Sequence, residues 1–241
     1  MDINISFHLP ISPSVLALSV VFLVNLLLAW RVWRSNSKHP VNIFFALTIL
    51  MAGLWTFGLL IEAFYIGATN VSGFLRFIHF APIPAVFFFY LFTYYFPYKT
   101  YKLAKGQVIA LLFFTALVSV IVVMPGLMIA PEVPRVNTLR PYYDYSLYII
   151  FVFYFIVIAI LAFCNLFFKY RKSVGIWRHR LRQVIIATSV AFVGGSICNL
   201  LIPFFLNRYI LNGYLAPIFT IFTAFYIWYT IFWKPNQPER G

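Results

Sequence analysis

Charged side chains are scarce in this sequence: they make up 10% of its 241 residues, and only five residues are acidic. Soluble domains carry about 25% charged and about 45–50% apolar residues, whereas 63% of this chain is hydrophobic. A soluble fold of this length could not hide so much apolar surface from water. The composition therefore predicts an integral, all-α membrane protein.

Residues that bind metals or cofactors are also rare. The two cysteines, Cys164 and Cys198, lie in apolar runs without disulfide or metal-ligand spacing. His79 is the only histidine well inside such a run, so a bis-histidine haem lacks its second ligand, and Lys234 lies beyond the last run, which argues against a retinal Schiff base. No phosphate loop, dinucleotide fingerprint or Ser/His/Asp set is present. We expect no cofactor, no metal and no enzymatic activity in these residues.

Seven apolar runs are long enough to cross a bilayer, whose hydrocarbon core of about 30 Å needs about 20 helical residues. They predict a single seven-helix domain over residues 1–241. Pro82 and Pro84 interrupt the third run, which predicts a kink there. The runs cover approximately residues 12–33, 41–66, 71–96, 107–129, 145–168, 183–204 and 212–233.

Basic residues lie mostly in alternate connections between these runs. The first, third and fifth connections and the C-terminal tail together hold 14 of the 18 lysines and arginines. Cytoplasmic loops of membrane proteins carry this excess, so we expect the N-terminus outside and the C-terminus in the cytoplasm. The net charge of +13 then needs no nucleic-acid partner.

Three ionisable residues stand within the apolar stretch LWTFGLLIEAFYIGATNVSGFLRFIHF, residues 54–80. Each costs at least about 2.5–3.5 kcal/mol at the centre of a membrane helix. Glu62 and Arg76 lie equally far from the middle of the intervening loop, so we expect them at the same depth, with His79 one turn deeper. An ion pair that pins the hairpin and a ligand pocket opening outward are both open interpretations.

Small residues predict where helices approach closely. Trp55, Gly58 and Glu62 share one helix face. Gly58 would admit a neighbouring helix there, and Trp55 would form the floor of the space below Glu62. In the sixth run Ala187, Ala191 and Gly195 recur every four residues, a spacing that permits contact within the bundle or between the protomers of a homodimer.

The stretch NIFFALTILMAGLWTFGLLIE, residues 42–62, resembles the amino-terminal seven-helix membrane domain of bacterial and archaeal sensor histidine kinases. The similarity is concentrated in residues 41–96. It implies a sensory input domain in a prokaryotic cell (cytoplasmic or inner) membrane, which partners the lipid bilayer and a cytoplasmic signalling module or protein of a two-component system. The positions that carry the resemblance are Asn42, Phe45, Trp55, Gly58, Glu62, Arg76, Pro84 and residues 87–92.

One departure from that family limits the expected activity. The sequence ends eight residues after the last run, in KPNQPERG, without a phosphoacceptor histidine region or ATP-binding boxes. Any kinase activity would lie outside these residues, in a longer chain or in a partner. We expect a receptor domain that detects an extracellular or membrane stimulus, such as a small-molecule or lipid ligand, and relays it by helix rearrangement. A small seven-helix transporter and a structural membrane subunit are the alternatives.

Overall fold

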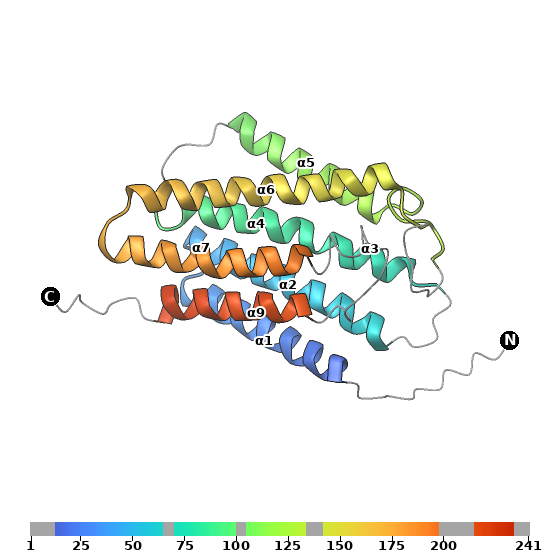
Figure 1. The fold of residues 1–241 in the computed structure, drawn as a ribbon, viewed down its shortest axis with the longest axis horizontal. Coiled ribbons are helices and arrows are strands. Elements are labelled where there is room, and N and C mark those ends of the chain that lie inside the picture. The colour runs from blue at the N-terminus through green and yellow to red at the C-terminus, as the bar shows by residue number, and fades with distance from the viewer. Residues whose placement is uncertain (1–12, 65–69, 100–104, 134–141, 198–214, 234–241) are drawn as a thin grey trace.

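The computed structural model describes residues 13–64, 70–99, 105–133, 142–197 and 215–233. These ranges form a bundle of helices (Figure 1), and the β-pairing within them is a single isolated bridge between Ile129 and Tyr143. The helices are α1 (Pro13–Ser35), α2 (Pro40–Phe64), α3 (Ser72–Phe80), α4 (Pro82–Tyr95), α5 (Lys105–Val123), α6 (Tyr145–Lys172), α7 (Gly175–Ser196) and α9 (Leu215–Trp228), followed by the π-helical turn η3 (Tyr229–Trp233).

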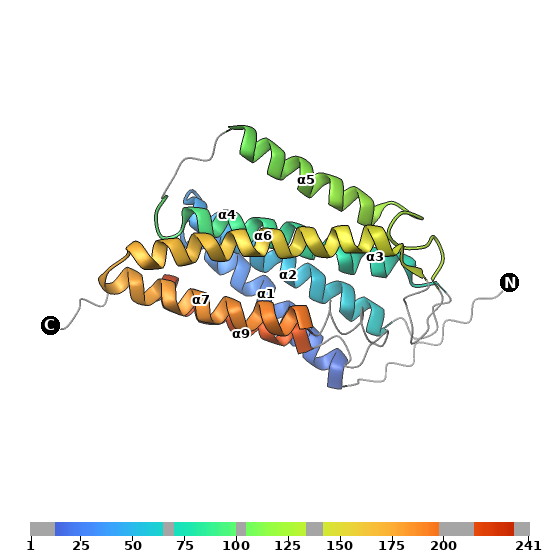
Figure 2. The ribbon, with the colours of Figure 1, turned by 45° about the horizontal axis from the view of Figure 1, so that its top comes forward.

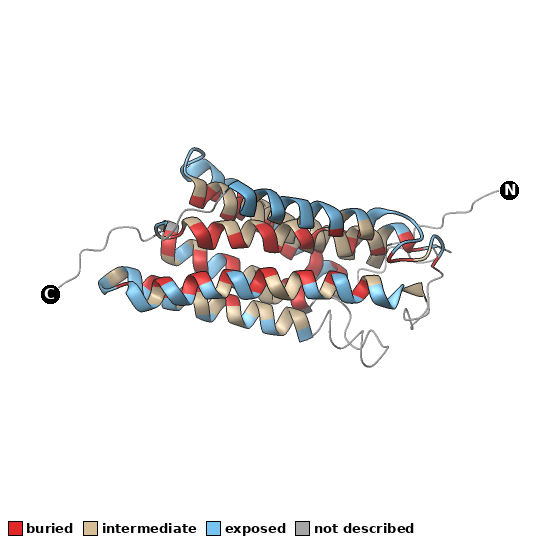
Figure 3. Ribbon diagram, turned by 90° about the horizontal axis from the view of Figure 1, so that it is seen from above, coloured by how far each residue is buried: buried red, intermediate tan, exposed pale blue. Residues whose placement is uncertain are grey.

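Five segments of the described chain are long and apolar enough to cross a membrane: α1, α2, α3 with α4, α5, and α6. A shorter apolar helix covers Ala216–Ile231. Large apolar side chains such as Leu27, Phe113 and Phe153 lie exposed on the outside of the bundle, and exposed residues run along its outer helix faces (Figure 3). An apolar exterior of this extent suits lipid rather than water, so the chain has the character of a multi-pass membrane protein.

The third run forms two helices, α3 and α4, which meet where Pro82 and Pro84 predict a kink. The regular pattern is interrupted at Ala81, between the end of α3 and the start of α4. Pro82 and Pro84 have no N–H, so the carbonyl groups of Ile78 and Phe80 receive no helical hydrogen bond from them. Ala81 keeps helical dihedral angles, so α4 continues approximately along the course of α3 (Figure 1).

Two helices have bounds that differ from those of their apolar runs. The fourth run was expected to continue to residue 129, but α5 ends at Val123, and the chain turns back through Gly126, whose φ is 80°. Pro125 and Gly126 end the helix although the hydropathy continues. The sixth run was expected to begin at residue 183, but α7 begins at Gly175, which leaves only residues 173–174 between α6 and α7.

The bundle has two ends that differ in chemistry. We call the end that holds the start of α3 and of α6 the Arg76 end, and the opposite end, with the α6–α7 connection, the Lys169 end (Figure 1). Helix α2 packs against α1, α3, α4 and α9, and α6 packs against α4, α5 and α7. Helix α5 stands at the edge (Figure 2), and Val118 and Val122 are its buried residues.

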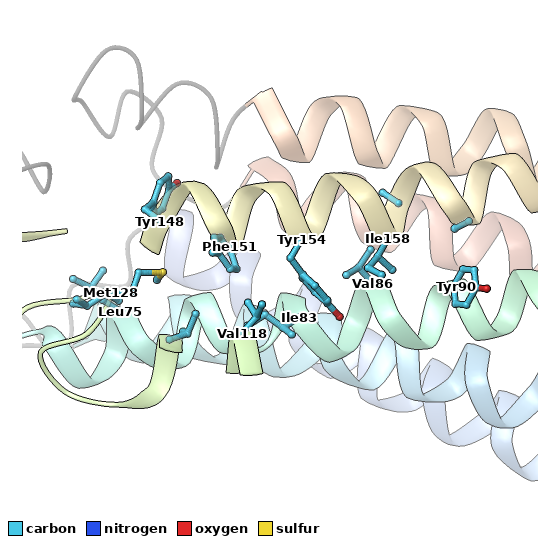
Figure 4. Close-up of a cluster of buried hydrophobic side chains, with 14 of the residues drawn as sticks. Leu75, Ile83, Val86, Tyr90, Val118, Met128, Tyr148, Phe151, Tyr154 and Ile158 are labelled. Carbon is cyan, nitrogen blue, oxygen red and sulfur yellow. The ribbon is translucent and has the colours of Figure 1, made fainter. Parts of the chain in front are cut away.

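The bundle core joins α3, α4, α5 and α6 toward the Arg76 end. Phe151, Tyr154 and Ile158 of α6 point toward α4, where Ile83 and Val86 meet them (Figure 4). A second buried cluster lies toward the Lys169 end and joins α1, α2, α4, α6, α7 and α9. Both clusters therefore contain α4 and α6.

Glycines mark two close helix contacts. A Cβ atom at Gly58 would lie 2.8 Å from Phe77 Cδ1 and 3.0 Å from Ile78 Cγ1, so α2 and α3 are in close contact there. In α7 the expected small-residue contact is shifted by one position. A Cβ at Gly195 meets no described atom within 4 Å, whereas a Cβ at Gly194 would lie 3.0 Å from Phe219 Cδ2 of α9.

Ala187, Ala191 and Gly195 form the small-residue stripe predicted on this helix, and Ala187 and Ala191 are both half-buried on α7. The carbonyl oxygen of Ala187 accepts a hydrogen bond from Thr223 Oγ1 of α9 at 2.8 Å. The stripe side of α7 therefore meets α9 of the same chain at Ala187 and Gly194. A homodimer through this stripe stays a prediction.

Candidate functional site

Ser72, Arg76 and His79 lie on one face of α3, because their spacings of four and three residues bring side chains together on a helix. The Arg76 Nη2 atom donates to Ser72 Oγ at 3.1 Å. Ser72 Oγ in turn donates to the carbonyl oxygen of Pro131 at 2.8 Å. The guanidinium group is thus hydrogen-bonded to a hydroxyl oxygen whose proton is donated to the Pro131 carbonyl group.

The other terminal nitrogen of Arg76, Nη1, is buried and has no hydrogen-bond partner among the described atoms. Glu62 lies half-buried near the end of α2. However, α3 meets α2 through Phe77 and Ile78 at Gly58, and Arg76 points to a different side of α3. The described contacts of Arg76 therefore do not support the expected ion pair with Glu62, which stays a prediction.

His79 is enclosed by aromatic rings. Its Nδ1 atom lies 2.7 Å from the Leu75 carbonyl oxygen, and its Nε2 atom lies 3.4 Å from the Tyr143 hydroxyl oxygen. A carbonyl can only accept, so Nδ1 carries a proton, and both ring nitrogens of His79 have a partner. The ring centroids of Tyr143, Tyr148 and Phe151 lie 5.5, 6.2 and 5.6 Å from that of His79.

Hydrogen bonds join two loop segments next to this site, residues 70–72 and residues 131–133. Asn70 Oδ1 accepts from the backbone N–H groups of Ser72 and Val133, at 2.9 and 3.2 Å. The Val71 N–H donates to the Val133 carbonyl oxygen at 2.9 Å. The start of α3 and residues 131–133 are therefore fixed against each other. Trp55 lies deeper, half-buried on α2, and it has no described contact with this site.

A second polar site lies at the Lys169 end, and sequence reasoning missed it. Lys169 is completely buried, and its Nζ atom donates to the carbonyl oxygens of Thr93, Tyr94 and Phe96 at 2.7, 2.7 and 2.8 Å. The carbonyl groups of Thr93 and Tyr94 belong to the last turn of α4 and that of Phe96 to its C-cap, where a helix leaves its acceptors unpaired and carries partial negative charge. One ammonium group uses all three of its donors here.

Neighbouring side chains reinforce this contact between α4 and α6. Asn165 Nδ2 donates to Thr93 Oγ1 at 3.4 Å, and the hydroxyl groups of Tyr98 and Ser173 lie 2.8 Å apart. The sequence places Lys169 in a basic connection, where lysines normally face solvent. Its partners are backbone carbonyl groups, so no residue type in the sequence indicates them.

Basic and aromatic side chains alternate around the Lys169 end. Six basic groups lie 4.2–5.2 Å from an aromatic ring centroid on or next to α1, α4, α6, α7 and α9. The pairs are Arg31–Trp228, Arg34–Trp30, Lys99–Tyr95, Lys172–Phe168, Arg178–Tyr170 and Arg180–Trp177. We call this set the basic–aromatic belt. Such pairs are favourable where a membrane meets water.

Metal binding and relatedness give no further indication of function. Within the described residues no three histidine, cysteine or acidic side chains group as metal ligands, and Cys164 is an exposed free thiol; Cys198 lies outside the described residues. No protein-family model matches the chain, and no curated protein or solved structure matches it significantly. The two polar ends of the bundle are therefore the features on which a function can be based.

Proposed function

We propose that this chain is a membrane-embedded sensory input domain with seven spans, which relays a stimulus from the Arg76 end to the Lys169 end. One observation carries the proposal: α6 is a single 28-residue helix that contacts both polar sites. Tyr148 and Phe151 surround His79 near its start, and Lys169 holds the end of α4 near its finish. Tyr148 and Lys169 are about 32 Å apart along the axis, at about 1.5 Å per residue.

The partner of α6 in this relay is the interrupted helix formed by α3 and α4. His79 lies on α3, and the carbonyl groups that Lys169 binds end α4, with Ala81 between the two helices. A stimulus that moves α3 against the start of α6 would change the angle at Ala81 or slide α6 along α4. Either motion would strain the contacts of Lys169, which are fixed by three hydrogen bonds. This is a hinge or shear motion of the kind that couples distant sites.

The basic groups of the basic–aromatic belt support an orientation with the Lys169 end in the cytoplasm, since lysine and arginine gather on the cytoplasmic side of a membrane, whereas aromatic rings mark either interface. The Arg76 end would then face outward, as a site for an external or membrane-borne stimulus should. The output would be a cytoplasmic signalling module of the histidine-kinase type. This part of the proposal rests on the sequence resemblance of residues 41–96.

Labelling of single cysteines tests this orientation. With Cys164 and Cys198 replaced by alanine, we expect Gly73→Cys to react with a membrane-impermeant maleimide in intact cells. Ser37→Cys should react only after the membrane is opened. Both positions are exposed, at the Arg76 end and the Lys169 end respectively. The reverse pattern would contradict the orientation.

Hydrogen exchange tests the relay. In His79→Ala the contact between α3 and the start of α6 is weakened, so we expect faster exchange of the Phe96 and Ser173 amides, which bond to Phe92 and Lys169 at the far end. The purified full chain in nanodiscs would be measured by mass spectrometry, with each variant held equally far below its unfolding midpoint.

Val118→Ala is the matched control, because Val118 is buried in the same core but belongs to α5. Its exchange at Phe96 and Ser173 should equal that of the wild type. Equal changes in both variants would contradict a directed relay. Flux of a solute through proteoliposomes that is lost in His79→Ala would favour the transporter alternative instead.

A further inference from the structure

We infer that Arg76 is the receptor group for an oxyanion, either the carboxylate or phosphate of a small solute or the phosphate of an anionic lipid headgroup. The inference names the ligand class of the Arg76 end, and its role in signalling rests on the proposed function. The binding site itself is argued from the contacts of Arg76, Ser72 and the loop above them.

The strongest observation is the unpaired donor. More than about 90% of buried polar groups in proteins have a hydrogen-bond partner, yet Arg76 Nη1 is buried and has none among the described atoms. Leaving a buried charged donor unsatisfied costs about 1–3 kcal/mol or more. An oxyanion would remove this penalty, because the guanidinium fork matches carboxylate and phosphate oxygens.

The guanidinium is also held in position before a ligand arrives. Nη2 is held by Ser72, and Ser72 is held by the Pro131 carbonyl group. The bonds of Asn70 to Ser72 and Val133 fix the loop over it. A ligand therefore meets an arginine that has already lost much of its rotational freedom, which lowers the entropic cost of binding.

The described carboxylates do not occupy the site. Asp144 caps the start of α6, where its Oδ1 accepts from the Leu147 N–H at 2.9 Å. Glu62 lies on α2, and the hydrogen bond described for Arg76 goes to Ser72 instead. Glu132 is exposed and directly follows Pro131, whose carbonyl oxygen accepts from Ser72 Oγ, so its charge would oppose an anion that binds beside the 131–133 loop. This makes Glu132 a useful probe of the site.

The neighbouring wall is aromatic. His79, one turn from Arg76, is surrounded by Tyr143, Tyr148 and Phe151, and its ring uses Nδ1 for the Leu75 carbonyl oxygen. Both ring nitrogens of His79 thus already have partners, in Leu75 and Tyr143, so Arg76 is the group that has a donor to offer an anion. The aromatic wall favours an anion with an apolar body, as in an aromatic carboxylate or a lipid.

The experiment measures the unfolding midpoint of the full chain in nanodiscs of phosphatidylcholine while benzoate, acetate or inorganic phosphate is added, with chloride as the ionic-strength control. A parallel measurement uses nanodiscs of equal parts phosphatidylcholine and phosphatidylglycerol without added anion. We expect the midpoint to rise with at least one oxyanion. A rise with the soluble anions indicates a solute, and a rise only with phosphatidylglycerol indicates a lipid headgroup.

The variants assign any rise to Arg76. Arg76→Gln should raise the anion concentration needed for half-saturation by about tenfold, or abolish the rise in midpoint. One hydrogen bond to a charged group changes an affinity by about that factor. Lys105→Gln removes an exposed positive charge at the other end and should behave as wild type. Glu132→Gln should strengthen binding, and this variant tests the site even if Arg76→Gln does not fold.

Two results would overturn the inference: no rise with any of these probes in wild type, or an undiminished rise in Arg76→Gln. An unchanged affinity in Glu132→Gln would overturn the placement of the anion beside the 131–133 loop. Binding without altered exchange at Phe96 and Ser173 would refute the relay and leave the site intact. A relay detected in His79→Ala without anion binding would refute the site alone.

Discussion

Lys169→Met is expected to destabilise the protein more than any other single change considered, by about 3 kcal/mol or more. Methionine retains most of the length and volume of the lysine stem, so the variant leaves little cavity. It removes the ammonium group that binds the carbonyl oxygens of Thr93, Tyr94 and Phe96. Those acceptors would remain buried without donors, which is the more costly half of losing a hydrogen bond.

The measurement is the unfolding midpoint in nanodiscs, together with exchange at the last turn of α4. Lys172→Met is the matched control, because Lys172 is exposed and contacts only the face of Phe168 among the interactions described. Its effect should stay within about 0.5 kcal/mol. Comparable losses in the two variants would show that the three carbonyl contacts contribute little.

Gly58→Leu is expected to destabilise the contact between α2 and α3 by about 2 kcal/mol, the usual range for forcing atoms into a packed interface. Even the first added carbon would lie 2.8 Å from Phe77 Cδ1 and 3.0 Å from Ile78 Cγ1. The two helices would have to separate to accommodate the rest of the side chain. Gly58→Ala should show a smaller loss of the same sign.

Gly73→Ala is the control for this series, since a Cβ at Gly73 meets nothing within 4 Å. Alanine favours a helix over glycine by up to about 1 kcal/mol, so this variant should match or exceed the stability of wild type. The unfolding midpoint measures the stability of all three variants. A neutral Gly58→Leu would contradict the close approach of α2 and α3.

Five of the apolar runs correspond to described segments that are long and apolar enough to cross a membrane, because a bilayer demands long apolar segments, whereas the count of seven spans stays a prediction. The helix ends were harder to predict. Hydropathy continues through residues 124–129 although Gly126 turns the chain, and α7 begins within a basic stretch that resembles a loop. Lysine and arginine are good helix formers, so positive charge marks a membrane boundary without ending a helix.

The candidate site was only partly predictable for a similar reason. Ionisable residues in an apolar run singled out Arg76 and His79, and their spacing placed them on one face of a helix. The rotation of α3 about its axis depends on which side chains pack against Gly58, and those are Phe77 and Ile78. Arg76 donates to Ser72 on its own face of α3, and its ion pair with Glu62 stays a prediction. Lys169 was missed because backbone acceptors have no signature in the sequence.

Helix α5 has a further consequence for how the protein would respond to its membrane. Val118 and Val122 are its buried residues, and Thr115 Oγ1 lies 2.9 Å from the hydroxyl group of Tyr154 on α6. Lipid tails are as apolar as the side chains of α5, so they compete with the bundle for its surface. A change in lateral pressure or bilayer thickness would therefore displace α5 first, and the Thr115–Tyr154 contact would transmit that mechanical load to α6.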